Sequence, residues 1–177
     1  MNLANKLTML RIFLIPVFMV FLLNKIPHGA SIAAGIFIVA AITDTLDGYI
    51  ARKRNEITNL GKFMDPLADK LLVSAALISL VQMGKLSAWV VVVIIGREFT
   101  ISILRAVAAA EGRVIAASLW GKTKTIFQII AIISILINNF PFNYFNFPFD
   151  TIMVWLAVIF TIISGVDYII INMDILK

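Results

Sequence analysis

Long apolar stretches fill almost all of this chain and leave it very few possible folds. Of its 177 residues, 61% are hydrophobic and 14% are charged, whereas a soluble domain is about a quarter charged. A helix crosses a bilayer with roughly 20 mainly apolar residues and satisfies its own backbone hydrogen bonds. We therefore predict an all-α, polytopic membrane protein with one domain over residues 1–177, in which residues 1–10 could form an interfacial helix. The six predicted transmembrane helices cover residues 7–24, 31–52, 61–83, 87–110, 119–138 and 148–173.

Charge and cysteine content limit the partners of such a protein. The net charge is +5, which here favours anionic lipid head groups and anionic substrates over nucleic acid. We therefore expect membrane lipid, and no nucleic acid, as a partner. Cysteine is absent, so disulfides and thiolate metal sites are excluded. The single histidine, His28, lies in a short polar loop, and the aromatic-rich segment 140–149 is typical of an interfacial aromatic belt.

Basic residues predict the orientation of the helices. Ten of them lie at the termini and in the second and fourth loops, and two lie on the opposite side. Because positive charge is retained in the cytoplasm, we expect a multi-pass protein of the cell membrane with both termini in the cytoplasm. The ten residues are Lys6, Arg11, Arg52, Lys53, Arg54, Lys62, Arg113, Lys122, Lys124 and Lys177, and the two are Lys25 and Lys85.

Four aspartates lie within 26 residues of this apolar chain. Asp44 and Asp47 are three residues apart on one face of the second predicted helix, and Asp65 and Asp69 are four apart on one face of the third. The loop between the two helices is short, so the helices are expected to be antiparallel neighbours whose acids face each other near the cytoplasmic end. A charge near the bilayer centre costs at least about 2.5 kcal/mol, so these acids need a compensating partner.

One or two divalent cations are the partner that this chemistry favours. Mg²⁺ and Mn²⁺ prefer oxygen ligands and can bridge phosphates. Gly48 and Gly61 remove side chains where a bulky ligand approaches the backbone, and Arg52 offers a planar fork suited to phosphate. The residues therefore indicate a metal-dependent site for a phosphate-bearing substrate at the inner membrane surface. In the alternative interpretation, the aspartates pair with nearby cations, namely Arg52, Lys53, Arg54, Lys62 and Lys70.

A second group of cations lies on the fourth and fifth predicted helices, mostly toward their cytoplasmic ends. Arg97 lies deeper than the others, where Glu98 or the aspartate site could hold it. The group predicts a pocket for a second phosphate-bearing substrate. The alternative is positive-inside anchoring with long side chains reaching the interface, which we favour for Arg113. The pocket candidates are Arg105, Lys122 and Lys124.

The aspartate spacing resembles the signature of the CDP-alcohol phosphatidyltransferases, D-x-x-D-G-x-x-A-R, eight residues, then G-x-x-x-D-x-x-x-D. The resemblance implies a six-helix membrane bundle, usually a homodimer, with two Mg²⁺ or Mn²⁺ ions between the second and third helices. It also implies that an alcohol attacks the β-phosphate of CDP-diacylglycerol and that CMP leaves. The positions that match, without a departure, are Asp44, Asp47, Gly48, Ala51, Arg52, Gly61, Asp65 and Asp69.

The same resemblance implies roles for single residues. Asp44, Asp47 and Asp65 would hold the metal ions, and Asp69 would be a shared ligand and the general base that takes the proton of the acceptor hydroxyl. Segments within residues 5–16, 96–105 and 121–128 resemble family members whose acceptor is sn-glycerol 3-phosphate. CDP-diacylglycerol would be framed by Asn5, Thr8, Gly48, Arg52 and Gly61, and the acceptor phosphate would be held by Arg97, Arg105, Lys122 and Lys124.

Two other functions fit parts of the pattern. A sibling transferase could use another acceptor, such as inositol phosphate, serine or phosphatidylglycerol. An ion-coupled transporter is a rival of another class, because acids within a membrane often mark cation paths. Transporters usually contain internal repeats, and no convincing repeat is found in this sequence.

Overall fold

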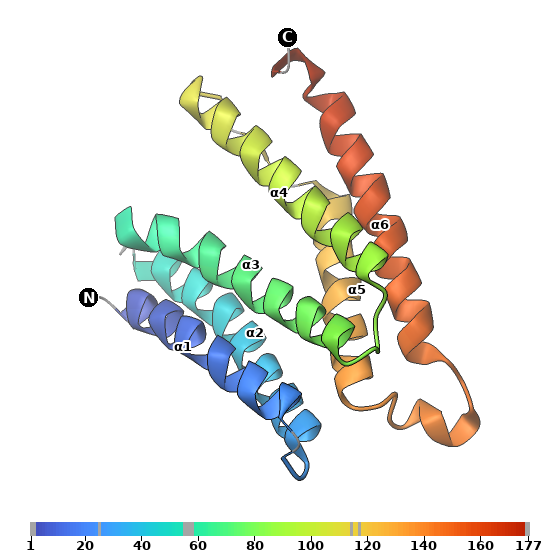
Figure 1. Cartoon of the computed structure of the whole chain (residues 1–177). Helices are drawn as coiled ribbons and strands as arrows, with labels where there is room; N and C mark the ends of the chain where they lie inside the picture. Colours follow the sequence, from blue (N-terminus) through green and yellow to red (C-terminus); the bar gives the residue numbers. More distant parts are fainter. Residues whose placement is uncertain (1–2, 25, 55–58, 114, 117, 176–177) are drawn as a thin grey trace. The chain divides into compact units, whose positions relative to one another are not determined.

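The computed structural model in Figure 1 describes residues 3–24, 26–54, 59–113, 115–116 and 118–175, and within them it describes all side chains except those of 3–4, 44–54, 59–63 and 175. The described chain contains helices and no strands, which confirms the predicted all-α fold with six long helices. The elements are α1 (Leu3–Leu23), α2 (Gly29–Arg54), α3 (Asn59–Gln82), α4 (Ala88–Ala110), α5 (Leu119–Leu136), η1 (Phe142–Phe145), α6 (Phe149–Ile171) and η2 (Met173–Ile175).

The helices differ in how well they suit a membrane. Three stretches in the described part of the chain are long and apolar enough to cross a bilayer, and a fourth apolar stretch, Gly29–Thr43, is shorter. α3 and α4 carry charged residues within their length, and their crossing of the membrane stays a prediction. The protein is thus an all-α membrane protein. The three stretches are Asn5–Leu23, Leu119–Leu136 and Phe149–Ile171.

The first compact unit, residues 1–85, is built around α1. This helix contacts both α2 and α3, which also contact each other. Phe18 and Phe37 are fully buried with ring centroids 6.0 Å apart, and buried alanines such as Ala33 and Ala76 let the helices approach closely. Residues 3–10 continue the apolar helix directly, so α1 includes the segment that could have been a separate interfacial helix.

The second compact unit, residues 86–177, is built around α6. This helix contacts α5 and α4. The rings of Phe127 and Phe160 stack with centroids 4.9 Å apart, and Ile101, Leu104 and Tyr168 form a buried cluster between α4 and α6. Each unit therefore has its own packed interior, and the organisation of residues 1–177 as a single domain stays a prediction.

The connections follow ordinary capping chemistry. Gly84 and Gly112, with φ of 69° and 74°, follow α3 and α4 in the left-handed conformation that glycine adopts without strain. Ser118 caps α5, because its hydroxyl oxygen accepts a hydrogen bond from the Gly121 N–H at 3.1 Å. These residues end α3 and α4 and begin α5.

The aromatic loop between α5 and α6 is held by Asn139. Its side-chain amide donates to the Phe147 carbonyl at 2.7 Å and accepts from the Asp150 N–H at 3.2 Å. Tyr144 and Phe145 are largely exposed at the loop tip. Exposed rings on an ordered loop are compatible with an interfacial belt, which stays a prediction.

Candidate functional site

A buried polar stripe on α1 forms one side of the first candidate cluster. Asn5, Thr8 and Arg11 are spaced by three residues and are all buried, so they share one helix face. The Thr8 hydroxyl donates a hydrogen bond to Asp65 Oδ1 on α3 at 2.5 Å. Two predicted site residues, Thr8 and Asp65, are thus brought together from positions 57 residues apart.

Asp65 and Asp69 lie one turn apart on α3, with the fully buried Ala68 beside them. The Asp65 side chain is partly buried, and that of Asp69 is exposed. Pro66 lies inside this helix, so the proline does not mark a helix start. Asp69 is therefore accessible to a ligand, while Asp65 is held in place by Thr8.

The remaining predicted members of this cluster lie outside the described side chains. Their backbone belongs to α2 and α3, two helices that contact each other. The prediction that they join Asp65 and Asp69 stays a prediction. They are Asp44, Asp47, Gly48 and Arg52 on α2 and Gly61 on α3.

The oxygen atoms of the described aspartates are ligands that suit a hard divalent cation. Asp65 and Asp69 offer carboxylate oxygens from one helix face, and Thr8 orients Asp65 as an outer hydrogen-bond partner does in metal sites. Among the side chains that the structure describes, no group of three acidic, histidine or cysteine residues is assembled. A complete ligand set would therefore require Asp44 and Asp47 as well.

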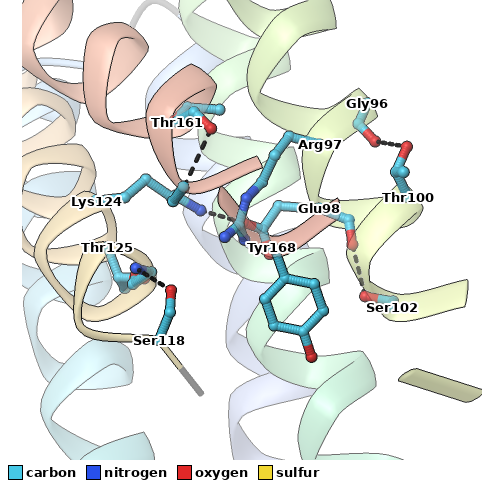
Figure 2. A network of polar contacts seen from close by, with 12 residues as sticks. Gly96, Arg97, Glu98, Thr100, Ser102, Ser118, Lys124, Thr125, Thr161 and Tyr168 are labelled. Atoms are coloured by element: carbon cyan, nitrogen blue, oxygen red, sulfur yellow. Dashed lines mark hydrogen bonds and ion pairs between the residues drawn. The ribbon is translucent and has the colours of Figure 1, made fainter. Parts of the chain in front are cut away.

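The second candidate cluster is an ion network in the other unit, which Figure 2 shows. The ammonium group of Lys124 on α5 forms an ion pair with Glu98 Oε1 on α4. Arg97 Nη1 lies 3.3 Å from the same oxygen. The side chains of Lys124, Arg97 and Glu98 are 3%, 14% and 26% exposed. A buried lysine and a partly buried arginine thus share one carboxylate oxygen, in surroundings that strengthen each charge–charge interaction.

Arg97 is seated against two glycines. A Cβ at Gly121 on α5 would lie 3.5 Å from Arg97 Nη2, and a Cβ at Gly165 on α6 would lie 3.2 Å from Arg97 Cγ. The second distance is tighter than an ordinary van der Waals contact. Glycine at these positions therefore leaves the space that the arginine side chain fills.

Two polar atoms near this network are buried without a hydrogen-bond partner in the described part of the chain. They are Arg97 Nε and Gln128 Oε1. Gln128 lies one helical turn beyond Lys124 on α5 and is also buried. A buried donor or acceptor that is left unsatisfied costs about 1–3 kcal/mol, and a polar ligand could remove that cost.

The other two predicted pocket cations are placed differently. Arg105 is exposed, its Nε donates to the Tyr168 hydroxyl at 2.7 Å, and its guanidinium carbon lies 5.3 Å from the Tyr168 ring centroid. Lys122 is exposed on the first turn of α5. Arg113, which we interpreted as an anchoring residue, forms an exposed ion pair with Asp174 at 3.2 Å. Side-chain contacts thus join Arg97 and Lys124 through Glu98, and hold Arg105 through Tyr168.

Sequence reasoning did not assign functional roles to several residues of these clusters. Glu98 gave a signal, since an acid within an apolar helix usually has a function or a partner. Arg11 also gave a signal, because it lies three residues after Thr8 and therefore on the same helix face. Tyr168 gave none, because it meets Arg105 across 63 residues.

Comparisons with known proteins agree with the signature of the aspartates. The model of the CDP-alcohol phosphatidyltransferase family matches residues 1–163. The CDP-diacylglycerol–glycerol-3-phosphate 3-phosphatidyltransferase of Bacillus subtilis (strain 168) is 50% identical, over 99% of this chain and 97% of the relative. The enzyme of the same name from Rickettsia bellii (strain RML369-C) is 37% identical over 94% and 93%. A probable phosphatidylglycerophosphate synthase of Mycobacterium tuberculosis (strain ATCC 25618 / H37Rv) is 40% identical over 95% and 80%.

The family model spans nearly the whole chain, and the relatives align along most of its length. Both findings indicate the same family. The chain belongs to the CDP-alcohol phosphatidyltransferase family.

Proposed function

We propose that this protein transfers the phosphatidyl group of CDP-diacylglycerol to sn-glycerol 3-phosphate, giving phosphatidylglycerophosphate and CMP. The observation that carries the proposal is the 50% identity, over almost the full length of both chains, to the Bacillus subtilis enzyme named for this reaction. The complete aspartate signature supports the donor half of the reaction. The buried Lys124 and the partly buried Arg97 support a phosphate-bearing acceptor.

The transfer makes one bond and breaks one bond. The acceptor hydroxyl oxygen attacks the β-phosphorus of CDP-diacylglycerol, and the bond from that phosphorus to the oxygen shared with CMP breaks. CMP leaves with the electron pair, and the hydroxyl proton passes to a base. Asp69 suits this role because its carboxylate is exposed on α3 and can meet the acceptor hydroxyl.

The aspartates would hold two Mg²⁺ or Mn²⁺ ions, which when bound supply positive charge that neutralises the pyrophosphate and stabilises the leaving CMP. The chain's own contribution is to orient the ligands. Thr8 holds Asp65 Oδ1 by a 2.5 Å hydrogen bond, which directs the remaining oxygen lone pairs of that carboxylate. The proposed ligands are Asp44, Asp47, Asp65 and Asp69, and the residues proposed to frame the nucleotide are Asn5, Thr8, Gly48, Arg52 and Gly61.

The cation network supports glycerol 3-phosphate as the acceptor. Arg97 and Lys124 are both largely buried, and a buried guanidinium and ammonium give strong, charge-assisted hydrogen bonds to a phosphate. Gln128 Oε1, buried one turn from Lys124, could accept a hydrogen bond from an acceptor hydroxyl. An uncharged acceptor would leave the cations without an added counter-ion. Arg105 and Lys122 complete the proposed acceptor set.

The membrane setting follows from the substrates. Diacylglycerol tails remain in lipid while both polar substrates are reached from water, so a site at the membrane surface suits the reaction. The basic-residue bias supports a cytoplasmic site with both termini in the cytoplasm. Homodimer formation is proposed from the family resemblance alone.

CMP release tests the function directly. Detergent-purified protein is incubated with CDP-diacylglycerol and Mg²⁺ or Mn²⁺, with and without glycerol 3-phosphate. We expect release that requires both the metal and glycerol 3-phosphate, and a lipid product that carries a phosphomonoester. Release that depends instead on inositol phosphate, serine or phosphatidylglycerol would retain the family and overturn the acceptor. An absence of release with every alcohol would overturn the proposed reaction.

A further inference from the structure

Glu98 holds two cations of the proposed acceptor site, Arg97 and Lys124, in the way that a phosphate oxygen would. The Lys124 ammonium and Arg97 Nη1 both meet one atom, Glu98 Oε1. One negatively charged oxygen between an ammonium and a guanidinium is the arrangement that a phosphate monoester makes with the same pair. The carboxylate therefore occupies the place of an anionic ligand.

The two cations are more firmly seated than the carboxylate. Arg97 fills the space beside Gly121 and Gly165, and the Lys124 side chain is 3% exposed. Glu98 is the most exposed of the three side chains, at 26%. Rotation of the Glu98 side chain away from the cations would make room for an external anion.

A phosphate monoester offers more acceptor atoms than Glu98 places between the cations. The Lys124 ammonium and Arg97 Nη1 share the single oxygen Glu98 Oε1. A phosphate monoester has three terminal oxygens, so each cation could receive an oxygen of its own. It would therefore make one separate charge-assisted hydrogen bond with each cation.

We propose that Glu98 is a specificity-determining residue that competes with the acceptor's phosphate for Arg97 and Lys124. The inference rests on the proposed function, because it takes these two residues as the acceptor-phosphate site. In the absence of acceptor, the carboxylate neutralises part of their charge. When the acceptor binds, its phosphate replaces the carboxylate, and Glu98 rotates away.

The charges explain which ligands can make this exchange. Two cations and one carboxylate carry a net charge of +1. A singly charged ligand gains little by replacing one negative charge with another, whereas a doubly charged phosphate monoester brings a second charge and a third oxygen. Glu98 therefore selects for phosphate monoesters over carboxylates and other monoanions.

The exchange also assists product release. The reaction does not consume the acceptor's phosphate, which remains on the lipid product. A site that bound this phosphate without a competitor would retain the product as well as the substrate. Return of the Glu98 carboxylate to Arg97 and Lys124 restores the starting ion pairs as the product departs.

Neutralising Glu98 should raise the affinity of the site for the acceptor's phosphate. In detergent-purified Glu98→Gln protein, we expect the KM for glycerol 3-phosphate to fall by about three- to tenfold, the range expected on losing a partly exposed competing ion pair. Inhibition by inorganic phosphate should tighten by a similar factor, and kcat should stay equal or fall. A role limited to folding would instead leave these affinities unchanged or weaken them.

Two further variants make the test decisive. Glu98→Asp keeps the charge but shortens the side chain, so its KM for glycerol 3-phosphate should lie between those of wild type and Glu98→Gln. If Glu98→Gln does not fold, the KM of Glu98→Asp alone tests whether residue 98 competes with the acceptor. Glu111→Gln makes the same chemical change at an exposed residue after α4 and should change nothing. A KM that is equal to wild type or higher in Glu98→Gln, or in Glu98→Asp when only that variant folds, overturns the proposal.

A binding measurement separates this inference from the proposed reaction. Inorganic phosphate should raise the Tm of Glu98→Gln by more than it raises that of wild type, whether or not either protein turns over glycerol 3-phosphate. If wild type shows no turnover but this difference is present, the proposed function fails and the competition at Arg97 and Lys124 stands. Equal Tm increases in the two proteins overturn the competition.

Discussion

The Thr8 hydroxyl of α1 donates a 2.5 Å hydrogen bond to Asp65 Oδ1 of α3. The donor is buried and the acceptor is partly buried, so water competes poorly for either group. The contact links a helix that carries no acid in the described chain to the helix that carries two of the proposed metal ligands. It makes α1 part of the proposed metal site as well as an apolar helix.

Removing the Thr8 hydroxyl should weaken metal binding. Thr8→Val keeps the side-chain volume but deletes the donor, and loss of such an outer partner typically lowers metal affinity by about 10- to 100-fold. We expect the Mn²⁺ concentration for half-maximal CMP release to rise by about tenfold or more. Thr8→Ser, which keeps the hydroxyl, is the matched control and should stay close to wild type. A Thr8→Val protein with wild-type Mn²⁺ dependence would show that this hydrogen bond does not tune the site.

Asp69→Asn should fold and bind CDP-diacylglycerol but lose nearly all turnover. The amide cannot take the proton of the acceptor hydroxyl, and loss of a general base alone lowers the rate by about 10²- to 10⁴-fold. The measurement is kcat for CMP release, with lipid binding followed separately. Asp174→Asn, an exposed acid paired with Arg113, is the control and should retain full activity. Substantial turnover by Asp69→Asn would remove Asp69 from the base role.

Lys124→Met should raise the KM for glycerol 3-phosphate far more than the KM for CDP-diacylglycerol. The Lys124 side chain is 3% exposed, and loss of its buried, charge-assisted hydrogen bond to the acceptor's phosphate should cost about 2–5 kcal/mol, or roughly 30-fold and more in affinity. Arg113→Met removes an exposed cation and should leave both constants unchanged. An unchanged acceptor KM in Lys124→Met would return Lys124 to an anchoring role.

A methyl group at Gly165 should disturb Arg97. The added Cβ would lie 3.2 Å from Arg97 Cγ, and overpacking of this kind costs about 1–3 kcal/mol. We expect Gly165→Ala to lower the Tm in detergent and to raise the KM for glycerol 3-phosphate severalfold. Gly96→Ala is the matched control, because a Cβ added at Gly96 would meet no atom of another residue within 4 Å beyond its own helix backbone; it should stabilise α4 by about 0.5–1 kcal/mol. Equal Tm and equal KM values in the two alanine variants would show that Arg97 is not closely packed against Gly165.

The long helices were predictable because each reflects a local property, a run of apolar residues that must satisfy its backbone within the membrane. The positions of the helix ends were less predictable. The apolar pattern placed the start of the first helix at residue 7, but α1 begins at Leu3, because polar residues such as Asn5 and Thr8 can be buried on one face. Proline disfavours a helix interior, yet Pro66 lies inside α3.

The site was predictable where its chemistry repeats at helical spacing. Asp65 and Asp69 share a face of α3 because they are four residues apart, and Arg97 stands out as a cation in an apolar helix. The contacts that position these residues join different helices. Nothing in the local sequence pairs Thr8 with Asp65, Arg105 with Tyr168, or Gly165 with Arg97, so these partners required the fold.

The seat of Arg97 limits how this protein could evolve a different acceptor. The same side chain that is proposed to bind phosphate also fills the space beside Gly121 on α5 and Gly165 on α6. Replacing Arg97 by a small neutral residue would remove a charge and open a void in one step, and larger residues at both glycines would be needed to close it. Such a change of substrate would have to pass through an intermediate sequence whose helices pack poorly. We therefore expect Arg97 to be replaced rarely during evolution.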